Sequence, residues 1–168
     1  EKAGFEHFMI KEIHEQPKAV SDTLNSVVKD GAIDLSEVGL SEEEIKEISQ
    51  IYIVACGSAY HVGVAAQYVM EDLARIPVRV ELASEFRYRN PILDPKGLVI
   101  IISQSGETAD SLAALRESKK QGVKTLGIVN VIGSSIAREA DNVFYTLAGP
   151  EIAVATTKAY STQLIATY

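Results

Sequence analysis

The stretch LVIIISQSGET, residues 98–108, decides how the rest of the sequence is interpreted. Its first five residues are apolar and mostly β-branched, with no alternation of polar and apolar side chains. This pattern indicates a strand buried on both faces, as in a parallel sheet covered by helices. A loop rich in hydroxyl and amide groups follows, and residues 107–120 then have helical character. The order of strand, polar loop and helix predicts an α/β fold.

Strands and helices alternate on both sides of this stretch. The predicted strands cover residues 51–55, 78–82, 98–102, 125–129 and 143–147. The predicted helices between and after them cover residues 59–74, 107–120, 134–140 and 154 onward. We expect a three-layer α-β-α sandwich with a five-stranded, parallel, doubly wound, flavodoxin-like sheet of order 2-1-3-4-5. In this order the loops after the first and third strands line one crevice.

Residues 1–40 are predicted to form an N-terminal helical arm and connector, and residues 41–168 the α/β domain. Apolar residues recur at roughly helical spacing in the arm, but Pro17 interrupts them, so two helical stretches joined at the proline are expected. Residues 30–41 have the composition of a loop. Ser41 and the three glutamates after it predict the capped start of a short helix.

Composition narrows the class of protein. The chain has 168 residues, of which 46% are hydrophobic and 23% charged, so one globular domain with a real core is expected. The net charge of −7 argues against nucleic acid or an anionic membrane as a partner. Cys56 is the single cysteine, and no Cys and His residues have metal-ligand spacing, so neither a disulfide nor a metal or other cofactor is predicted. With no secretory leader or membrane span, the sequence predicts a cytoplasmic protein.

The loop at residues 103–108 is the first candidate site. It places three hydroxyl groups (Ser103, Ser105 and Thr108), the amide of Gln104 and the flexible backbone of Gly106 at a helix N-terminus, which favours a phosphate group. A lone Ser or Thr here is more often a helix cap, but strand, donor-rich loop and helix in sequence favour the phosphate. A Walker lysine and a G-x-G-x-x-G pattern are both missing, so neither ATP nor a dinucleotide is expected.

Two further loops complete the candidate site. Gly57 and Ser58 follow the first strand, and Ser58 could bond the phosphate or a sugar hydroxyl. The segment EIAVATTKA, residues 151–159, follows the fifth strand, and Glu151 could be a carboxylate near the ligand or part of an ordinary loop. Cys56 has no base beside it in sequence, so packing is favoured over nucleophilic catalysis.

The residues at 103–110, SQSGETAD, resemble the phosphate loop of the sugar isomerase (SIS) family. Three more phrases, KEIHEQP at 11–17, ASEFRYR at 83–89 and EIAVATTKA at 151–159, are similar to those of the glucosamine-6-phosphate synthases within that family. These enzymes are glutamine:fructose-6-phosphate aminotransferases of the isomerizing kind. The resemblance covers nearly the whole chain, and four phrases in one order are far more specific than one loop.

The resemblance implies that the chain is the first of two SIS subdomains of the isomerase domain, truncated before the second. The glutaminase domain would precede it in the same polypeptide. The full enzyme converts fructose 6-phosphate and glutamine-derived ammonia to glucosamine 6-phosphate. The acid and base of that reaction belong to the missing part, so no catalytic residue is expected here and the fragment alone should bind a sugar phosphate without turnover.

By position, the family's phosphate contacts fall on Ser103, Gln104, Ser105 and Thr108, and the sugar contacts on Ser58 and the backbone of Val154. Gly57, Gly106 and Glu151 are further candidates. Two other functions stay open: an SIS module that senses a sugar phosphate for a partner, and a stand-alone sugar-phosphate isomerase. A homodimer is expected, because the cut would expose apolar surface.

Overall fold

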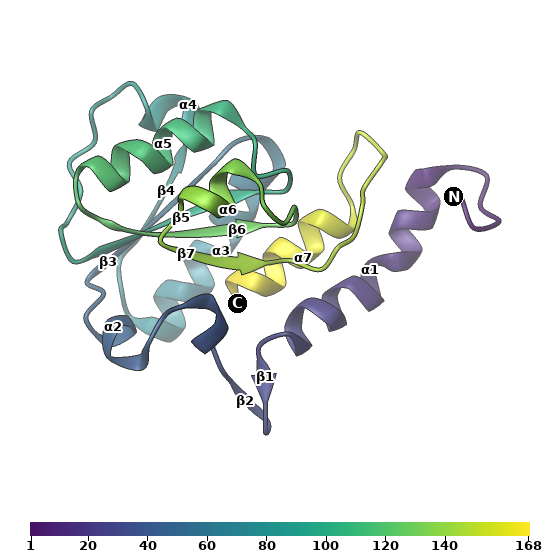
Figure 1. Ribbon diagram of the computed structural model, residues 1–168, viewed down its shortest axis with the longest axis horizontal. Coiled ribbons are helices and arrows are strands. Elements are labelled where there is room, and N and C mark those ends of the chain that lie inside the picture. The colour runs from purple at the N-terminus through teal and green to yellow at the C-terminus, as the bar shows by residue number, and fades with distance from the viewer.

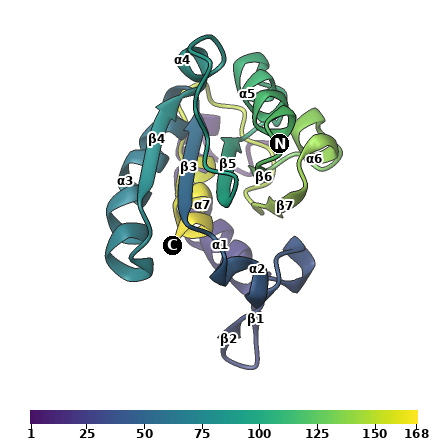
Figure 2. The ribbon, with the colours of Figure 1, turned by 90° about the vertical axis from the view of Figure 1, so that its left-hand side faces the viewer.

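The computed structural model describes residues 1–168 and has a central parallel sheet with helices on both sides (Figures 1 and 2). Its strands are β1 (Val28–Lys29), β2 (Ala32–Ile33), β3 (Gln50–Ala55), β4 (Val78–Leu82), β5 (Gly97–Ser103), β6 (Lys124–Val129) and β7 (Asn142–Tyr145). Its helices are α1 (Phe8–Asn25), α2 (Glu42–Lys46), α3 (Gly57–Ala74), α4 (Ala83–Phe86), α5 (Ala109–Lys120), α6 (Ser135–Glu139) and α7 (Lys158–Thr167), with a 3₁₀ turn, η1 (Ser36–Val38). No helix is both long and apolar enough to cross a membrane.

The five-stranded sheet has the order β4-β3-β5-β6-β7, and every pair in it is parallel. This is the predicted 2-1-3-4-5 order, and the three-layer doubly wound fold is confirmed. The chain leaves β3 toward β4 on one side and then returns to β5 on the other, so the order reverses between β3 and β5. Ligands of such sheets bind beyond the carboxyl ends of the strands at this reversal.

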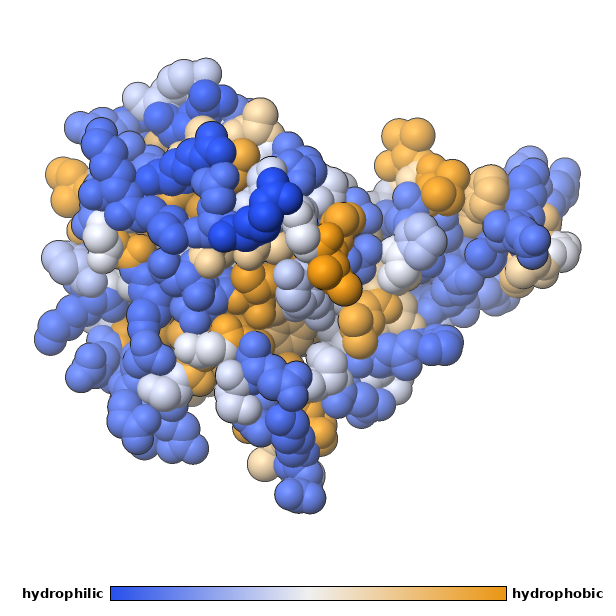
Figure 3. Space-filling view, viewed as in Figure 1, coloured by the Kyte–Doolittle hydropathy of each residue, from blue (hydrophilic) through white to orange (hydrophobic).

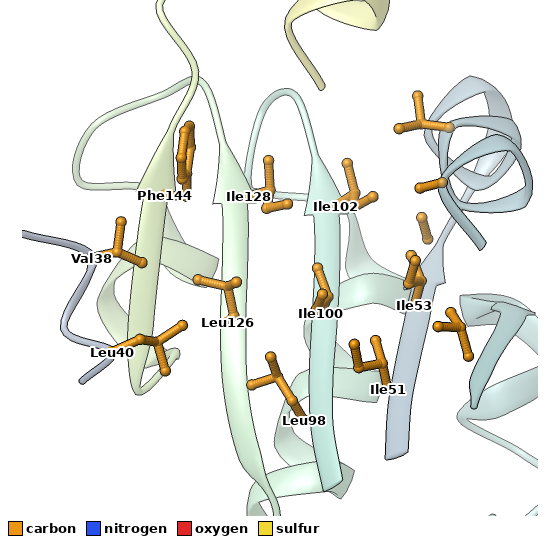
Figure 4. Close-up of a cluster of buried hydrophobic side chains, with 14 of the residues drawn as sticks. Val38, Leu40, Ile51, Ile53, Leu98, Ile100, Ile102, Leu126, Ile128 and Phe144 are labelled. Carbon is orange, nitrogen blue, oxygen red and sulfur yellow. The ribbon is translucent and has the colours of Figure 1, made fainter. Parts of the chain in front are cut away.

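Successive residues of the central strands β3 and β5 point into different hydrophobic clusters. Ile100 and Ile102 of β5 pack on the side of α3 and α7, whereas Val99 and Ile101 pack against α4, α5 and α6. Figure 4 shows the first cluster from above the sheet, with Val38 and Leu40 lying over its β7 edge. Both faces of β5 are therefore buried, which explains why residues 98–102 are continuously apolar.

Helix α1 does not break at Pro17, so the predicted pair of helices is wrong. A proline inside a helix removes the N–H that would bond the carbonyl four residues earlier. Here the side-chain amide of Gln16 donates to the carbonyl oxygen of Ile13 at 3.2 Å and replaces that bond. The helix also packs along α7 (Figure 1), which stabilises it beyond its own propensity.

Three smaller differences separate the structure from the predicted elements. The last helix begins at Lys158 and not at Val154, because residues 151–157 form an extended loop. Residues 28–33 form a hairpin of two strands, each two residues long, at the start of the region expected to be loop. A short helix, α4, lies in the connection after β4. The capped helix after Ser41 is confirmed, with a complete capping box between Ser41 and Glu44.

The two-sided core predicts a large cost for truncation on either face. Ile101→Ala should lower the free energy of unfolding by about 2–5 kcal/mol, because Ile101 is fully buried and its loss leaves a cavity. The matched control is Ile92→Ala, at an exposed isoleucine, which should change stability by less than about 0.5 kcal/mol. Urea denaturation of both variants measures the difference, and equal losses would contradict this assignment of the core.

Candidate functional site

A polar hollow of about 270 Å³ lies at the carboxyl edge of the sheet, where the strand order reverses. This volume is near the lower end of the roughly 300–1,000 Å³ typical of small-ligand sites. Three segments supply its walls: the start of α3, the loop between β5 and α5, and the loop before α7. The lining residues are Cys56, Ser58, Ala59, Ile102, Ser103, Gln104, Ser105, Thr108, Glu151, Ala153, Val154, Thr156 and Gln163.

The loop between β5 and α5 is shaped by its own hydroxyl groups. Ser103 is only 3% exposed, and its Oγ accepts the N–H of Gly106 at 3.1 Å and lies 3.0 Å from the Oγ1 of Thr108. The Oγ of Ser105 accepts the N–H of Glu107 at 3.2 Å. The hydroxyl of Ser103 therefore helps to fold the loop around the hollow.

Gly106 is required by sterics as well as by its backbone angle. Its φ of +66° lies in the left-handed region that side chains disfavour. A Cβ added here would lie 2.1 Å from the Oγ of Ser134. That Oγ is buried and has no hydrogen-bond partner, so the loop before α6 is packed directly onto Gly106.

Glu107, the only acidic residue in this loop, is bonded to a different helix. Its Oε1 accepts the N–H of Ser135 at 2.7 Å, at the first turn of α6. Hydrogen bonding to Ser135, helped by the positive charge of Arg138, lowers the pKa of the Glu107 carboxyl below its usual value. The carboxylate therefore caps α6 and is not among the groups that line the hollow.

The N-termini of α3 and α5 meet at the hollow without side-chain caps. The N-cap residues Cys56 and Thr108 make no side-chain hydrogen bond to their own helices. The first N–H groups of a helix have no partner within it, and the helix dipole is positive there. Two adjacent helix ends with free donors give this acidic chain a local preference for an anion.

The third wall is the loop before α7, which stands out from the sheet in Figure 1. The Oε2 of Glu151 accepts the N–H groups of Thr157 and Ala159 at 3.1 and 2.9 Å, so Glu151 caps α7. Glu151 was expected either near a ligand or in an ordinary loop; it lines the hollow, and its capping role was not predicted. Val154 is fully exposed, and Figure 3 shows hydrophobic surface at the tip of this loop.

The structure thus brings most of the predicted site residues to one hollow. Those that line it are Ser58, Ser103, Gln104, Ser105, Thr108, Glu151 and Val154. Gly57 and Gly106 do not line it but shape the backbone beside it, both with positive φ. The hollow also includes Thr156 and Gln163, which the sequence did not single out as ligand contacts.

Sequence analysis missed the contribution of α1 to this site. Glu12 is 2% exposed, and its carboxylate accepts the N–H of Ile152 at 2.6 Å. A glutamate in an amphipathic helix is usually expected at the surface. The one available signal was the helical spacing of Glu12 with Gln16, Ala19 and Thr23, which form one stripe of α1.

The arginines after β4 also have partners within the chain. Arg87 donates to the carboxylate of Asp110 at 2.6 Å, and Arg89 pairs with Glu81. Asp110 lies in the first turn of α5, so Arg87 ties the segment after α4 to the helix that begins at the hollow.

Comparison with known proteins gives one family. The model of the SIS domain matches residues 44–168. The glutamine–fructose-6-phosphate aminotransferase (isomerizing) of Clostridium tetani is 60% identical over 169 residues, which cover 100% of this chain and 28% of that protein. The chain therefore spans about 28% of the length of the curated relatives it matches.

Two solved structures show the same fold. The C-terminal domain of the glucosamine–fructose-6-phosphate aminotransferase from Francisella tularensis superposes with a TM-score of 0.94 at 48% identity, covering 99% of this chain and 47% of that one. The sugar isomerase domain of the RpiR transcription factor from Sphaerobacter thermophilus superposes with a TM-score of 0.71 at 19% identity, covering 94% and 85%. At that identity the second likeness concerns the fold alone.

The contact between Gly106 and Ser134 predicts an unequal effect of two glycine substitutions. Gly122→Ala introduces a side chain at a φ of +75° with open space around it, which should cost about 1 kcal/mol of stability. Gly106→Ala meets the same backbone penalty and the clash with Ser134, which should add about 1–3 kcal/mol. Thermal denaturation compares the two variants, and equal losses would contradict the close packing.

The capping role of Glu107 predicts a pH dependence. Its folded-state pKa lies below the usual 4.5, so its stabilisation is present above pH 4.5 and is lost as pH falls through the folded pKa. The difference in unfolding free energy between the wild type and Glu107→Gln should therefore be largest near neutral pH and shrink below pH 4.5. Urea denaturation from pH 3 to 7 measures it. Glu1→Gln, at an exposed glutamate outside any helix or strand, is the control, and a pH-independent difference for Glu107→Gln would contradict the cap.

Proposed function

Because this chain belongs to the SIS domain family, we propose that it is the sugar-phosphate-binding first SIS subdomain of a glucosamine-6-phosphate synthase. The observation that carries the proposal is the hollow at the strand reversal, with two uncapped helix N-termini and a polar lining in which Glu151 is the one carboxylate. Such a site suits a phosphate group. The identity of 60% to an aminotransferase along the whole chain supports fructose 6-phosphate as the ligand.

The loop before α5 is proposed to hold the phosphate. Gln104, Ser105 and Thr108 present side chains to the hollow, and the first turn of α5 adds backbone N–H groups. Ser103 contributes a hydroxyl from the floor and keeps the loop folded through Gly106. Because Glu107 caps α6, no carboxylate of this loop opposes the anion.

The sugar is proposed to lie between α3 and the loop before α7. Ser58 offers a hydroxyl from the first turn of α3, and the backbone at Val154 faces the same hollow. Gly57 gives the turn into α3 its shape, and Glu151 fixes the start of α7. Hydroxyl and backbone groups of this kind can pair with the hydroxyl groups of a sugar without charge.

The complete reaction needs more than this chain. In the proposed parent enzyme, glutamine-derived ammonia and fructose 6-phosphate give glucosamine 6-phosphate, with a glutaminase domain and a second SIS subdomain in the same polypeptide. Proton transfer between adjacent carbons requires a positioned acid–base group. The ionisable side chains at the hollow are Cys56 and Glu151, and Glu151 is bonded to α7. We therefore propose that residues 1–168 bind the substrate and that catalysis requires the other domains.

The domain organisation and assembly belong to the same proposal. Residues 41–168 would be the SIS subdomain, in agreement with the family match over 44–168, and residues 1–40 its helical arm. We also propose that the chain forms a homodimer through apolar surface and that it is cytoplasmic. A stand-alone isomerase is disfavoured by the shortage of free acid–base groups, and the regulatory alternative has only a likeness of fold in its support.

Gln104 offers the cleanest test of the phosphate site, because its side chain lines the hollow while the hydroxyl of Ser103 is engaged in the loop. Gln104→Ala should weaken the binding of fructose 6-phosphate and glucosamine 6-phosphate about tenfold, the effect of losing one hydrogen bond to a charged group. Isothermal titration calorimetry measures both ligands, with free fructose and AMP as compounds that should not bind.

Gln121→Ala is the matched control, since Gln121 follows the opposite end of α5 and bonds the carbonyl of Pro91. It should leave the affinity for both sugar phosphates unchanged. Failure of the wild-type chain to bind either sugar phosphate would count against the proposed ligand. Equal affinity in the wild type and Gln104→Ala would remove Gln104 from the phosphate site.

A further inference from the structure

One face of α1 forms hydrogen bonds to the connection between β7 and α7 and to α7 itself. The Oγ1 of Thr23 accepts the N–H of Leu147 at 2.9 Å, at the start of this connection. The amide oxygen of Gln16 accepts the hydroxyl of Ser161 at 2.6 Å, within α7. Glu12 bonds the middle of the connection, at Ile152 and Ala153. Helix α1 is therefore in direct contact with the backbone of the third wall of the hollow.

Glu12 is the unusual member of this stripe, because a carboxylate is rarely buried without a cation. Lys11 of α1 and Lys158 of α7 both pair with Glu15 and not with Glu12. The Oε1 of Glu12 accepts the N–H of Ile152 at 2.6 Å, and both oxygens lie within 3.4 Å of the N–H of Ala153. Backbone N–H groups of the site loop thus take the place of a counter-ion.

The loop has few other attachments. Asn130 donates to the carbonyl of Gly149, before the loop tip, and Glu151 bonds the start of α7, after it. Between these points the side chains of Ile152 and Val154 are exposed and add little packing. The position of Ala153 and Val154 in the wall of the hollow therefore depends on the carboxylate of Glu12.

We propose that Glu12 is a positioning residue for sugar recognition: its buried carboxylate fixes the loop at Ile152 and Ala153 so that the Val154 backbone meets the sugar. The inference rests on the proposed function, since it assigns the loop to the sugar. Glu12 contacts no residue of the phosphate loop through a hydrogen bond. Its effect should therefore separate the sugar from the phosphate.

The test compares two ligands and two substitutions in the 168-residue chain. Glu12→Gln keeps the shape of the side chain but removes its negative charge and replaces one acceptor oxygen by an NH2 group, so one neutral oxygen is left for the N–H groups of Ile152 and Ala153. It should weaken the binding of fructose 6-phosphate about tenfold and that of inorganic phosphate by less than about twofold. Calorimetry measures the sugar phosphate, and NMR titration measures the weaker phosphate ion.

Thr23→Val is the matched control. It removes a hydrogen bond of the same kind, from the same face of α1 to the same connection, but at Leu147, which is outside the hollow. It should lower stability without changing either affinity. Amide hydrogen exchange adds a readout without ligand: the N–H groups of Ile152 and Ala153 should exchange faster in Glu12→Gln and at the wild-type rate in Thr23→Val.

The outcomes separate this inference from the proposed function. Unchanged affinity for fructose 6-phosphate in Glu12→Gln, or equal losses for both ligands, would overturn the positioning role. A loss of the same size in Thr23→Val would show that general stability decides binding, and would overturn it too. If the wild-type chain binds inorganic phosphate but not fructose 6-phosphate, both the assignment of the loop to the sugar and the positioning role of Glu12 are wrong. If the wild-type chain binds neither ligand, the proposed function fails, while faster exchange at Ile152 and Ala153 would still support the hold of Glu12 on the loop.

Discussion

Parallel pairing of β3 with β4 on one side and β5 on the other sends the chain away from β3 in opposite directions. The connections after β3 and β5 lie on opposite faces of the sheet, so the starts of α3 and α5 can approach each other beyond the carboxyl ends of these two strands. The polar groups that α3 and the loop before α5 supply to the hollow depend on this arrangement. The side chains of Ser58 and Gln104 are distant in sequence, but they start from neighbouring strands. The site is therefore a direct product of the sheet order.

The charges around the hollow resolve an apparent conflict in the sequence. A chain with a net charge of −7 is a poor long-range attractor of anions. Three carboxylates around the site are each bonded to backbone N–H groups: Glu12 to the loop tip, Glu107 to α6 and Glu151 to α7. Their negative charge is offset by those dipoles, whereas the N-termini of α3 and α5 have no such partner. In the proposed function, local dipoles and not net charge would draw an anion to the hollow.

Local patterns predicted the sheet, its order and the loop at residues 103–108, because runs such as 98–102 have one low-energy environment. What escaped prediction depended on particular side-chain contacts, some of them between distant residues. The continuity of α1 through Pro17 depends on the side chain of Gln16 and on packing against α7. The late start of the last helix depends on Glu151, whose partners Thr157 and Ala159 lie 6 and 8 residues away. The loop before that helix is bonded to Glu12, whose partners lie 140 and 141 residues away. A single sequence has no local signal for such pairs.

The bond between Glu12 and Ile152 has a consequence for how the molecule is assembled in time. It joins residues separated by 140 positions, so it closes a loop that includes nearly the whole chain. Contacts of this separation have a high entropic cost and form late in folding. The loop at residues 103–108 needs only β5, α5 and their neighbours and can form earlier. During synthesis from the N-terminus, α1 must therefore wait for the last helix before the third wall is complete.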